Sequence, residues 1–265
     1  MKTRRLNLWA LFWAAAGLLY FFLPMYGTLD FSLRMKKGVL SLLAYQVVLS
    51  DPQFLASFRY SALMGVITVI VSTIIFLPTI YWIYLRLIKI RPVIEIITIL
   101  PFIIPVIVYV FGLIRTFGRP PLQLTLTPFK TDILITAGYV VLSMPYMYRA
   151  IDVGMRSIDV RTLTEAAQSL GAGWHQILLK VIVPNLRIAI LSGALITFAL
   201  VMGELILGDF LVRPALGPYM VQVGRDRAYE PAALAMLSYG LTWLCLGLIQ
   251  LVSKGGTSQQ QLTGR

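Results

Sequence analysis

Long apolar runs alternate with short polar segments along the whole chain. A helix needs about 20 apolar residues to cross the hydrocarbon core of a bilayer. Six runs approach or exceed that length. The pattern therefore predicts an all-α integral membrane protein with a single transmembrane domain over residues 1–265, whose six spans lie at about 8–23, 60–85, 93–114, 133–148, 186–207 and 232–252.

The first apolar run, Leu8–Leu23, follows the basic residues Lys2, Arg4 and Arg5. Basic residues also precede the apolar core of a signal peptide. The run ends in the sequence LPMY, Leu23–Tyr26, and shows no small-residue A-x-A cleavage pattern. We therefore interpret it as an uncleaved membrane anchor.

The composition agrees with burial in lipid. Hydrophobic residues make up 58% of the chain, charged residues only 13%, and the mean hydropathy is +0.81. Soluble domains have about 45–50% apolar and about 25% charged residues. The net charge of +12 would suggest a nucleic-acid partner in a soluble protein, but these basic residues lie between apolar runs. Basic residues in such positions orient membrane proteins, so we expect contact with membrane lipid and no nucleic-acid partner.

The short segment Arg86–Arg91 holds three basic residues in six positions and is expected on the cytoplasmic side. This places both termini of a multi-pass membrane protein in the cytoplasm. The segment 254–265 is rich in Gly, Ser and Gln, a composition typical of disorder.

Prolines recur inside the predicted spans, at Pro78, Pro101, Pro105 and Pro145. In a membrane bundle, neighbouring helices can satisfy the backbone groups that a proline frees, so these residues are compatible with ordinary kinks. The alternative is that kinked helices line a path that opens and closes.

A short amphipathic helix is expected within Arg149–Pro184, the longest cytoplasmic segment. Thr162 or Thr164 can cap its N-terminus, where the helix dipole favours Glu165. Its apolar face, with spacing i, i+3, i+4 and i+7, consists of Leu163, Ala166, Ala167 and Leu170. Small residues there let another protein approach closely, although a helix lying on the membrane surface explains the spacing equally well.

Two further signals follow this helix. Gly171–Gly173 is expected to end it, because glycine accepts the left-handed conformation at a helix C-terminus. A second amphipathic stretch runs from Trp174 to about Val183, and Pro184 suits the first turn of the next helix.

The order Glu165-Ala166-Ala167, three residues, Gly171, nine residues and then Val181–Pro184 resembles the EAA loop, E-A-A-x3-G-x9-I-x-L-P, of binding-protein-dependent ABC importer permeases. Valine replaces Ile and Leu at positions 181 and 183. The resemblance extends to the proline pair in Leu100–Pro105, to Met144–Tyr146 before Ser157–Asp159, and to Ser192–Ala194 before Phe198. It implies the six-transmembrane-helix ABC importer permease fold.

The resemblance also implies roles for residues of the loop 155–184. Glu165 would pair with a basic residue of a cytoplasmic ABC ATPase dimer, Ala166 and Ala167 would permit close packing, and Gly171 would make the turn, with Leu170 and Pro184 completing the coupling motif. The other implied partners are an extracytoplasmic substrate-binding protein and a second permease subunit, which would make a heterodimer.

The chain itself is expected to be non-catalytic and to bind no cofactor or metal. It has one cysteine, Cys245, and one histidine, His175, and no G-x-x-x-x-G-K-[ST] phosphate loop, since Lys254–Ser258 has similar residue types in the wrong order. ATP and Mg²⁺ would therefore bind the partner ATPase.

The substrate is less strongly indicated. The chain looks most like the second permease of spermidine/putrescine-type importers, so a polyamine is expected, with ferric iron, sulfate, thiamine or a phosphonate as alternatives. Glu204 and Asp209 are candidate cation contacts, because an acid near an apolar span is a functional hypothesis by default. Glu204 could instead cap a helix or close an outer gate, and Tyr146 could line the path or belong to an interfacial belt.

Three other classes of membrane protein fit the sequence less well. A channel or secondary transporter would need inverted repeats or broken helices around a midplane site, and the sequence shows no internal repeat. A membrane-embedded enzyme would need clustered His, Asp or Glu. A structural subunit without a transport role is excluded only by the EAA resemblance.

Overall fold

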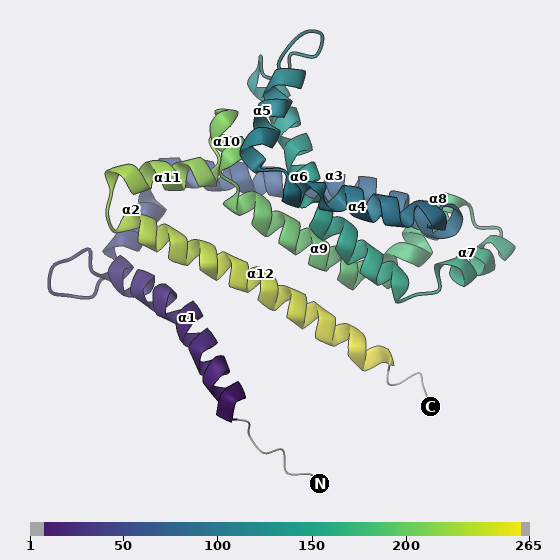
Figure 1. Ribbon diagram of the computed structural model, residues 1–265, viewed down its shortest axis with the longest axis horizontal. Helices are drawn as coiled ribbons and strands as arrows, with labels where there is room; N and C mark the ends of the chain where they lie inside the picture. The colour runs from purple at the N-terminus through teal and green to yellow at the C-terminus, as the bar shows by residue number, and fades with distance from the viewer. Residues whose placement is uncertain (1–7, 261–265) are drawn as a thin grey trace. The chain divides into compact units, whose positions relative to one another are not determined.

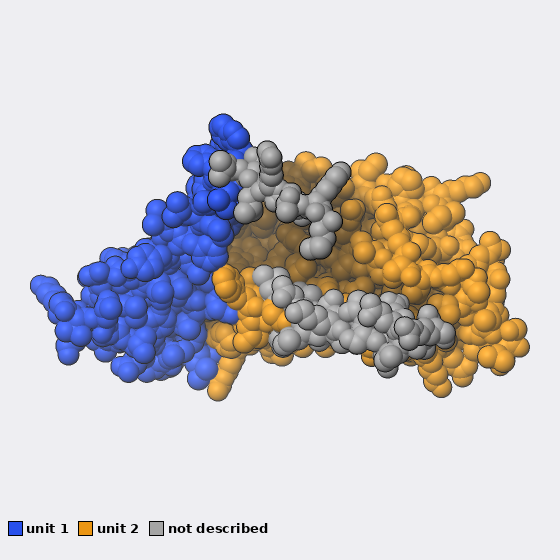
Figure 2. All heavy atoms as spheres, turned by 90° about the horizontal axis from the view of Figure 1, so that it is seen from below, with its two compact units in different colours: residues 1–55, 219–240 blue, residues 56–218, 241–265 orange. Residues whose placement is uncertain are grey.

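The structure is a computed structural model that describes residues 8–260, all of whose regular elements are helices (Figure 1). Contacts divide the chain into two compact units, where the sequence predicts a single domain. Unit 1 comprises residues 1–55 and 219–240, and unit 2 comprises residues 56–218 and 241–265 (Figure 2).

Unit 1 joins the N-terminal helices to a segment from the other end of the chain. Its elements are α1 (Leu8–Leu33), α2 (Leu43–Ser50), the first residues of α3, most of α11 (Leu216–Asp226) and the first turns of α12 (Glu230–Gln260). The ring of Phe31 stacks on Tyr229 with 4.8 Å between centroids. The hydroxyl of Tyr219 donates to Asp51 over 3.0 Å, which ties α11 to the residue just before α3.

Unit 2 holds the apolar cores that support the site. Its elements are α3 (Pro52–Arg86), the 3₁₀ turn η1 (Ile88–Ile90), α4 (Arg91–Ile103), α5 (Val106–Phe117), α6 (Pro128–Arg156), α7 (Val160–Ser169), α8 (Trp174–Gln176), the π-helical turn η2 (Ile177–Ile182), α9 (Val183–Gly203) and α10 (Ile206–Phe210). One core joins α3, α6, α7 and η2 around Ile80, Met147 and Ile177. A second joins α5, α6 and α10 around Val110, Ile135 and Leu207.

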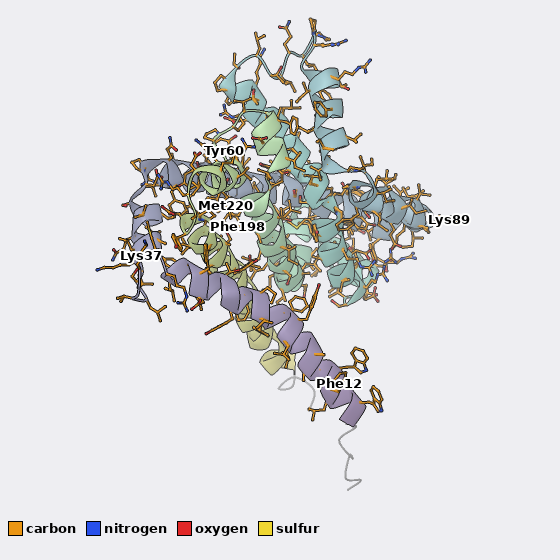
Figure 3. The ribbon with its side chains drawn as sticks, turned by 60° about the vertical axis from the view of Figure 1, so that its left-hand side comes forward. Phe12, Lys37, Tyr60, Lys89, Phe198 and Met220 are labelled. Carbon is orange, nitrogen blue, oxygen red and sulfur yellow. The ribbon has the colours of Figure 1, made fainter. Side chains whose placement is uncertain are left out.

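Glycines allow α9 to pack tightly on its neighbours. A Cβ atom on Gly154 of α6 would lie 2.6 Å from the Cβ of Ala189 of α9. On α3, a Cβ atom on Gly65 would lie 2.8 Å from the ring of Phe198, which Figure 3 labels. Small residues at helix contacts are the usual means of close approach in membrane bundles.

The third predicted span is not one helix. α4 and α5 meet at an angle of 101°, and Figure 1 shows α5 turned away from α4. Pro105 explains the break, because proline lacks an N–H and forces the preceding residue out of the helical region. Ile104 is accordingly extended, with ψ 121°. The span predicted over 93–114 is therefore made of two helices, and the bend at Pro105 is much sharper than the ordinary kink expected there.

Several other boundaries differ from the expected ones. α1 continues through Pro24 to Leu33, ten residues beyond the predicted end of the first span. The segment 25–59, expected as a loop, contains the end of α1, all of α2 and the start of α3. Residues 254–260 belong to α12, where disorder was expected, and residues 261–265 of the expected tail lie outside the described residues.

Three helical segments of the described chain are long and apolar enough to cross a membrane: Leu11–Leu33, Pro52–Arg86 and Trp174–Gly203. The bent α4–α5 pair makes a fourth if it counts as one span. α6 and α12 coincide with the two remaining predicted spans but do not belong to that set. The prediction of an all-helical membrane protein is confirmed, and three or four of its six spans have the expected length and hydropathy.

Candidate functional site

The predicted coupling helix is α7, and it begins earlier than expected. Asp159 caps it, since its carboxylate accepts hydrogen bonds from the backbone N–H of Thr162 over 3.1 Å and from the Thr162 hydroxyl over 2.7 Å. The expectation that Thr162 or Thr164 is the cap is wrong. These bonds from Thr162, the hydroxyl first, hold the pKa of Asp159 below its ordinary value of 3.8.

The buried face of α7 consists of Val160, Thr164 and Ala167, rather than the predicted face of Leu163, Ala166, Ala167 and Leu170. The hydroxyl of Thr164 donates to the carbonyl of Val160 over 2.6 Å and shares a hydrogen bond of 3.2 Å with the hydroxyl of Tyr81 of α3. Ala167 therefore packs on the chain's own core and is not available to a partner.

The opposite face of α7 is exposed. It presents Glu165 and Ala166, and Leu170, which directly follows the helix, is 88% exposed. Glu165 forms an ion pair of 2.9 Å with Arg161 one turn earlier, and both side chains are mostly exposed. Such a surface pair contributes little to stability, so Glu165 can exchange Arg161 for another basic group at small cost.

Gly171 ends α7 in the expected way, with φ +79°. The N–H of Gly171 donates to the carbonyl of Gln168 over 2.9 Å, and the N–H of Ala172 to the carbonyl of Ala167 over 3.1 Å. This pair of bonds is the Schellman motif, which requires a left-handed residue where Gly171 stands. Gly173 then begins α8 in an extended conformation, with φ −74°.

Pro184 is the second residue of α9, but no new helix starts there. The helical segment is continuous from Trp174 to Gly203, and the π-helical turn η2 lies immediately before Val183 and Pro184. A wider turn accommodates a residue that has no N–H to donate. Pro184 lines a groove, and no residue of α7 belongs to the lining of that groove.

This groove has a volume of about 1300 Å³ and lies between α4, α6 and α9. Tyr146 lines it, and its ring meets that of Phe102 edge-on at 5.3 Å. The polar and charged residues that line the groove are Glu95, Thr98, Tyr146, Tyr148, Arg149, Asp152, Ser157, Asn185, Arg187 and Ser192.

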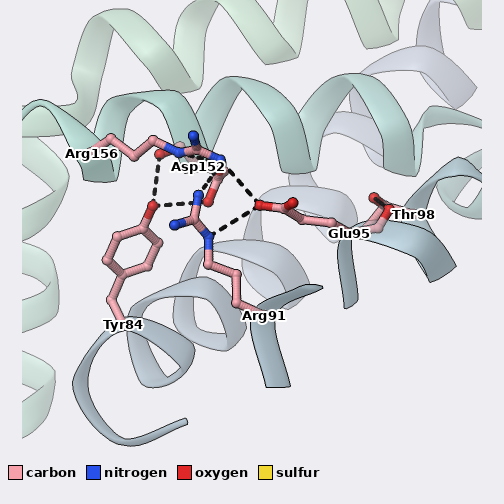
Figure 4. A network of polar contacts seen from close by, with 6 residues as sticks. All are labelled: Tyr84, Arg91, Glu95, Thr98, Asp152 and Arg156. Atoms are coloured by element: carbon pink, nitrogen blue, oxygen red, sulfur yellow. Dashed lines mark hydrogen bonds and ion pairs between the residues drawn. The ribbon is translucent and has the colours of Figure 1, made fainter. Parts of the chain in front are cut away.

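A network of ion pairs and hydrogen bonds forms part of one wall of the groove (Figure 4). Asp152 is 1% exposed, and its Oδ2 lies 3.0 Å from Arg91 and 2.8 Å from Arg156. Glu95 bridges the same two guanidinium groups at 3.2 and 3.1 Å. The hydroxyl of Tyr84 donates to Asp152 over 2.9 Å, so the network ties the end of α3 to α4 and α6.

A second network, in the same unit, joins α3 and α6 to the connection after α10. The hydroxyl of Tyr60 donates to Asp132 over 2.6 Å, and Arg213 donates to Asp132 over 3.0 Å and to the Tyr60 hydroxyl over 3.2 Å. Sequence reasoning missed both networks. The available signal was an acid inside or beside a predicted span, at Asp132 and at Asp152, the latter with a basic residue four positions later.

The two candidate cation contacts, Glu204 and Asp209, do not lie in the groove that Tyr146 lines. The carboxylate of Glu204 accepts from the backbone N–H groups of Ile206 and Leu207 at 2.8–3.1 Å and so caps α10, in agreement with the capping alternative. Asp209 is exposed on α10. Neither residue lines the groove. Among the described residues, no group of three or more His, Cys, Asp or Glu side chains is arranged to hold a metal ion.

Residues 54–254 match the family described as "Binding-protein-dependent transport system inner membrane component". The chain is 25% identical to the "Spermidine/putrescine transport system permease protein PotC" of Escherichia coli K12 over 219 residues, which is 80% of each chain. It is 27% identical over 256 residues to the "Probable molybdenum ABC transporter permease protein" of Haloferax volcanii, covering 92% of this chain and 88% of the other.

Solved structures share the fold. A chain of a bacterial ABC transporter involved in the import of the acidic polysaccharide alginate superposes with a TM-score of 0.67 and 15% identity, covering 97% of this chain and 96% of that one. A chain of the methionine ABC transporter MetNI superposes with a TM-score of 0.55 and 19% identity, covering 77% of this chain and 98% of that one.

Proposed function

Because the chain belongs to the family of binding-protein-dependent transport system inner membrane components, we propose that it forms part of the translocation pathway of an ATP-driven importer and is driven through α7 by a separate ATPase. Members of this family are non-catalytic permease subunits, and ATP is bound by their partner ATPase. The importer class is therefore established by the family, and the roles of individual residues are what we propose.

The observation that carries the coupling role is the two-sided character of α7. Its inner face, with Thr164 and Ala167 buried, is fixed to the core that also holds α3, α6 and η2. Its outer face presents Glu165 and Ala166, and Leu170 directly follows the helix; all three side chains are exposed in the part of the chain that the structure describes. A partner that docks on the outer face can therefore move α7 and the helices packed behind it as one body.

The groove supplies a path that such movement can change. α6 and α9 line two of its walls and also belong to the core on which α7 is anchored. α4, its third wall, ends at the break before Pro105. Displacement of α7 by an ATPase would shift α6 and α9 against α4 and so alter the width of the groove.

The remaining proposals concern the assembly. We place both termini in the cytoplasm, with α7 facing the ATPase dimer and the other end of the bundle facing the binding protein. A second, different permease subunit would complete the pathway. The Tyr60–Asp132–Arg213 network, which lies at the start of α3 and α6, would then brace the side that faces the binding protein.

The names of the two relatives give different transported solutes. The Escherichia coli relative supports the polyamine expected from the sequence, and the Haloferax relative supports a molybdenum compound at similar identity. Glu204 no longer supports a polyamine, because its carboxylate is occupied as a helix cap. The charges of the residues that line the groove help to distinguish between these two kinds of solute.

Two measurements on tagged protein in its native membrane test the proposed function. After mild solubilisation, an ATPase with a phosphate loop and a second permease should co-purify with the wild-type chain. Glu165→Lys should abolish uptake of the importer's substrate while the chain stays in the membrane, because it puts a like charge where the ATPase is expected to offer a basic residue. Wild-type uptake by Glu165→Lys would refute the role of α7, and purification of the chain alone would point to a channel or secondary transporter.

A further inference from the structure

The carboxylates that line the groove are already neutralised. Asp152 contacts the guanidinium groups of Arg91 and Arg156 at 3.0 and 2.8 Å, and Glu95 contacts the same pair at 3.2 and 3.1 Å. Neither Arg91 nor Arg156 lines the groove; the two side chains contact these carboxylates from behind its lining. A polycation in the groove would have to displace them from Asp152, which is 1% exposed and would be left partly unpaired during the exchange.

The basic residues of the groove are not neutralised in this way. Arg149 on α6 and Arg187 on α9 line it, are exposed, and form no ion pair with any carboxylate within residues 8–260. Four arginines thus accompany two carboxylates in the groove and its wall. The local charge is positive, and the two free guanidinium groups come from helices on different walls.

Tyr148 adds an unused hydrogen-bond donor. Its side chain is 3% exposed and lines the groove, and its hydroxyl has no hydrogen-bond partner in the described part of the chain. A buried tyrosine hydroxyl normally has a partner, because an unsatisfied polar group is costly to bury. Tyr148 immediately precedes Arg149 and stands one helical turn before Asp152.

We propose that the groove between α4, α6 and α9 is a transit site for a small oxyanion, held by the guanidinium groups of Arg149 and Arg187 and by the hydroxyl of Tyr148. Oxyanions offer several acceptor oxygens, and guanidinium groups bind them through paired N–H donors. The inference rests on the proposed importer function and assigns the sign and chemistry of its substrate.

A topological role is the competing explanation for Arg149 and Arg187, since basic residues gather at the cytoplasmic ends of membrane helices. That role depends on positive charge and is equally well served by lysine. It also gives no reason for an unpartnered hydroxyl at Tyr148. Replacement of arginine by lysine therefore separates the two explanations, because lysine keeps the charge but cannot form the paired contact.

The test is ATP-driven uptake by the complete importer, with its ATPase, second permease and binding protein, in proteoliposomes. Labelled molybdate, sulfate, phosphate and spermidine serve as probes. We expect one of the oxyanions, and not spermidine, to accumulate. Arg149→Gln and Arg187→Gln should each lower that uptake at least about tenfold, the size expected for a lost charge-assisted contact. Arg187→Lys should remain several-fold impaired, and Tyr148→Phe should lower the apparent affinity.

Matched controls change the same residue types outside the groove. Lys130→Gln removes a positive charge from the first turn of α6, and Tyr239→Phe removes an exposed hydroxyl, and neither residue lines the groove. Both should transport at the wild-type rate. ATP hydrolysis stimulated by the binding protein should persist in all variants.

The outcomes separate this inference from the proposed function. Uptake of spermidine alone, or oxyanion uptake that is unchanged in Arg149→Gln, Arg187→Gln and Tyr148→Phe, would overturn the oxyanion site and leave the importer intact. Full activity of Arg187→Lys together with loss in Arg187→Gln would assign that residue to topology and overturn its place in the site. Absence of any ATPase from the purified complex would instead overturn the proposed function.

Discussion

Among the residues that follow α7, Gly171 has the backbone conformation that most restricts which amino acid can replace it. Its φ of +79° lies in the left-handed region, and a Cβ atom there would meet no neighbouring atom within 4 Å, so the constraint is conformational and not steric crowding. A side chain in this conformation costs about 1–2 kcal/mol. Gly173, two residues later, also has open space around it but an ordinary φ of −74°.

This contrast gives a matched pair of substitutions. Gly171→Ala should impair transport, and Gly171→Asp should abolish it, because the strained turn no longer sets the end of α7 for the ATPase. Gly173→Ala should retain near wild-type transport. Uptake assays at equal amounts of protein in the membrane measure both, and equal tolerance at the two positions would show that the turn conformation is unimportant.

The cap of α7 predicts a pH dependence. Because bonds from Thr162 lower the folded-state pKa of Asp159 below 3.8, the stabilising effect of the charge is fully present above the unfolded pKa and is lost as the pH falls through the folded one. Hydrogen-exchange protection of the first amides of α7 should therefore be constant near neutral pH and decrease in acid. Asp159→Asn, which keeps an acceptor but has no charge to lose, should remove this dependence. Protection that rises on acidification would contradict the assigned cap.

At the scale of elements, the pair α6 and α9 connects α7 to the groove. α6 ends at Arg156, three residues before Asp159, and α9 continues the helical segment that starts at Trp174 after the Gly171 turn. Their contact is close at Gly154 and Gly193, where an added Cβ atom would lie 2.6 Å from the Cβ of Ala189 and 2.6 Å from the Sδ of Met147, so that one of the two neighbours would have to shift. This contact is therefore where movement of α7 would reach the path.

Gly154→Ala tests that contact directly. The new Cβ would lie 2.6 Å from that of Ala189, and overpacking of this kind costs about 1–3 kcal/mol. Thermal stability in detergent and transport should both fall. Ala189→Gly in the same chain should restore them, because it returns the missing space. Gly112→Ala on α5, where a Cβ would meet nothing within 4 Å, is the control. If the double variant is as impaired as Gly154→Ala, the helices are not packed through these two residues.

Part of this architecture could be predicted from short stretches of sequence. The apolar runs predicted helices. The EAA spacing predicted α7 and the turn after it, because glycine is the residue that most readily adopts the left-handed conformation that ends a helix. The face of α7 could not be read in the same way. Leu170 lies at an apolar position of the helical pattern, yet it is 88% exposed, while the hydroxyl of Thr164 is buried against Tyr81. Which side of a short amphipathic helix packs inward depends on partners distant in sequence.

The two polar networks that sequence reasoning missed also depend on residues that are far apart in the sequence. Asp152 is held by Arg91, 61 residues earlier, and Asp132 by Arg213, 81 residues later, and no short window contains either pair. The break before Pro105 was visible as a proline, but membrane helices often tolerate proline, so its 101° bend could not be distinguished from an ordinary kink.

At the scale of the whole molecule, the chain is one subunit of a larger transport complex. Family membership places it in the membrane with a binding protein and an ATPase, while its own surface offers an exposed α7 and a positively charged groove. In the proposed mechanism an ATPase moves α7, the cores behind α7 move α6 and α9, and the groove changes width around the solute.

Site-specific crosslinking at position 166 tests that account most directly. Cys245 is the only cysteine, so Ala166→Cys with Cys245→Ser carries a single thiol on the exposed face of α7. A thiol-attached photocrosslinker in the assembled complex should capture a protein with a G-x-x-x-x-G-K-[ST] phosphate loop, in a yield that changes with ATP. Leu126→Cys in the same background, exposed in the connection between α5 and α6, should not capture it. If a transport-competent complex gives no ATPase crosslink from position 166, or an equal one from position 126, α7 is not the coupling helix.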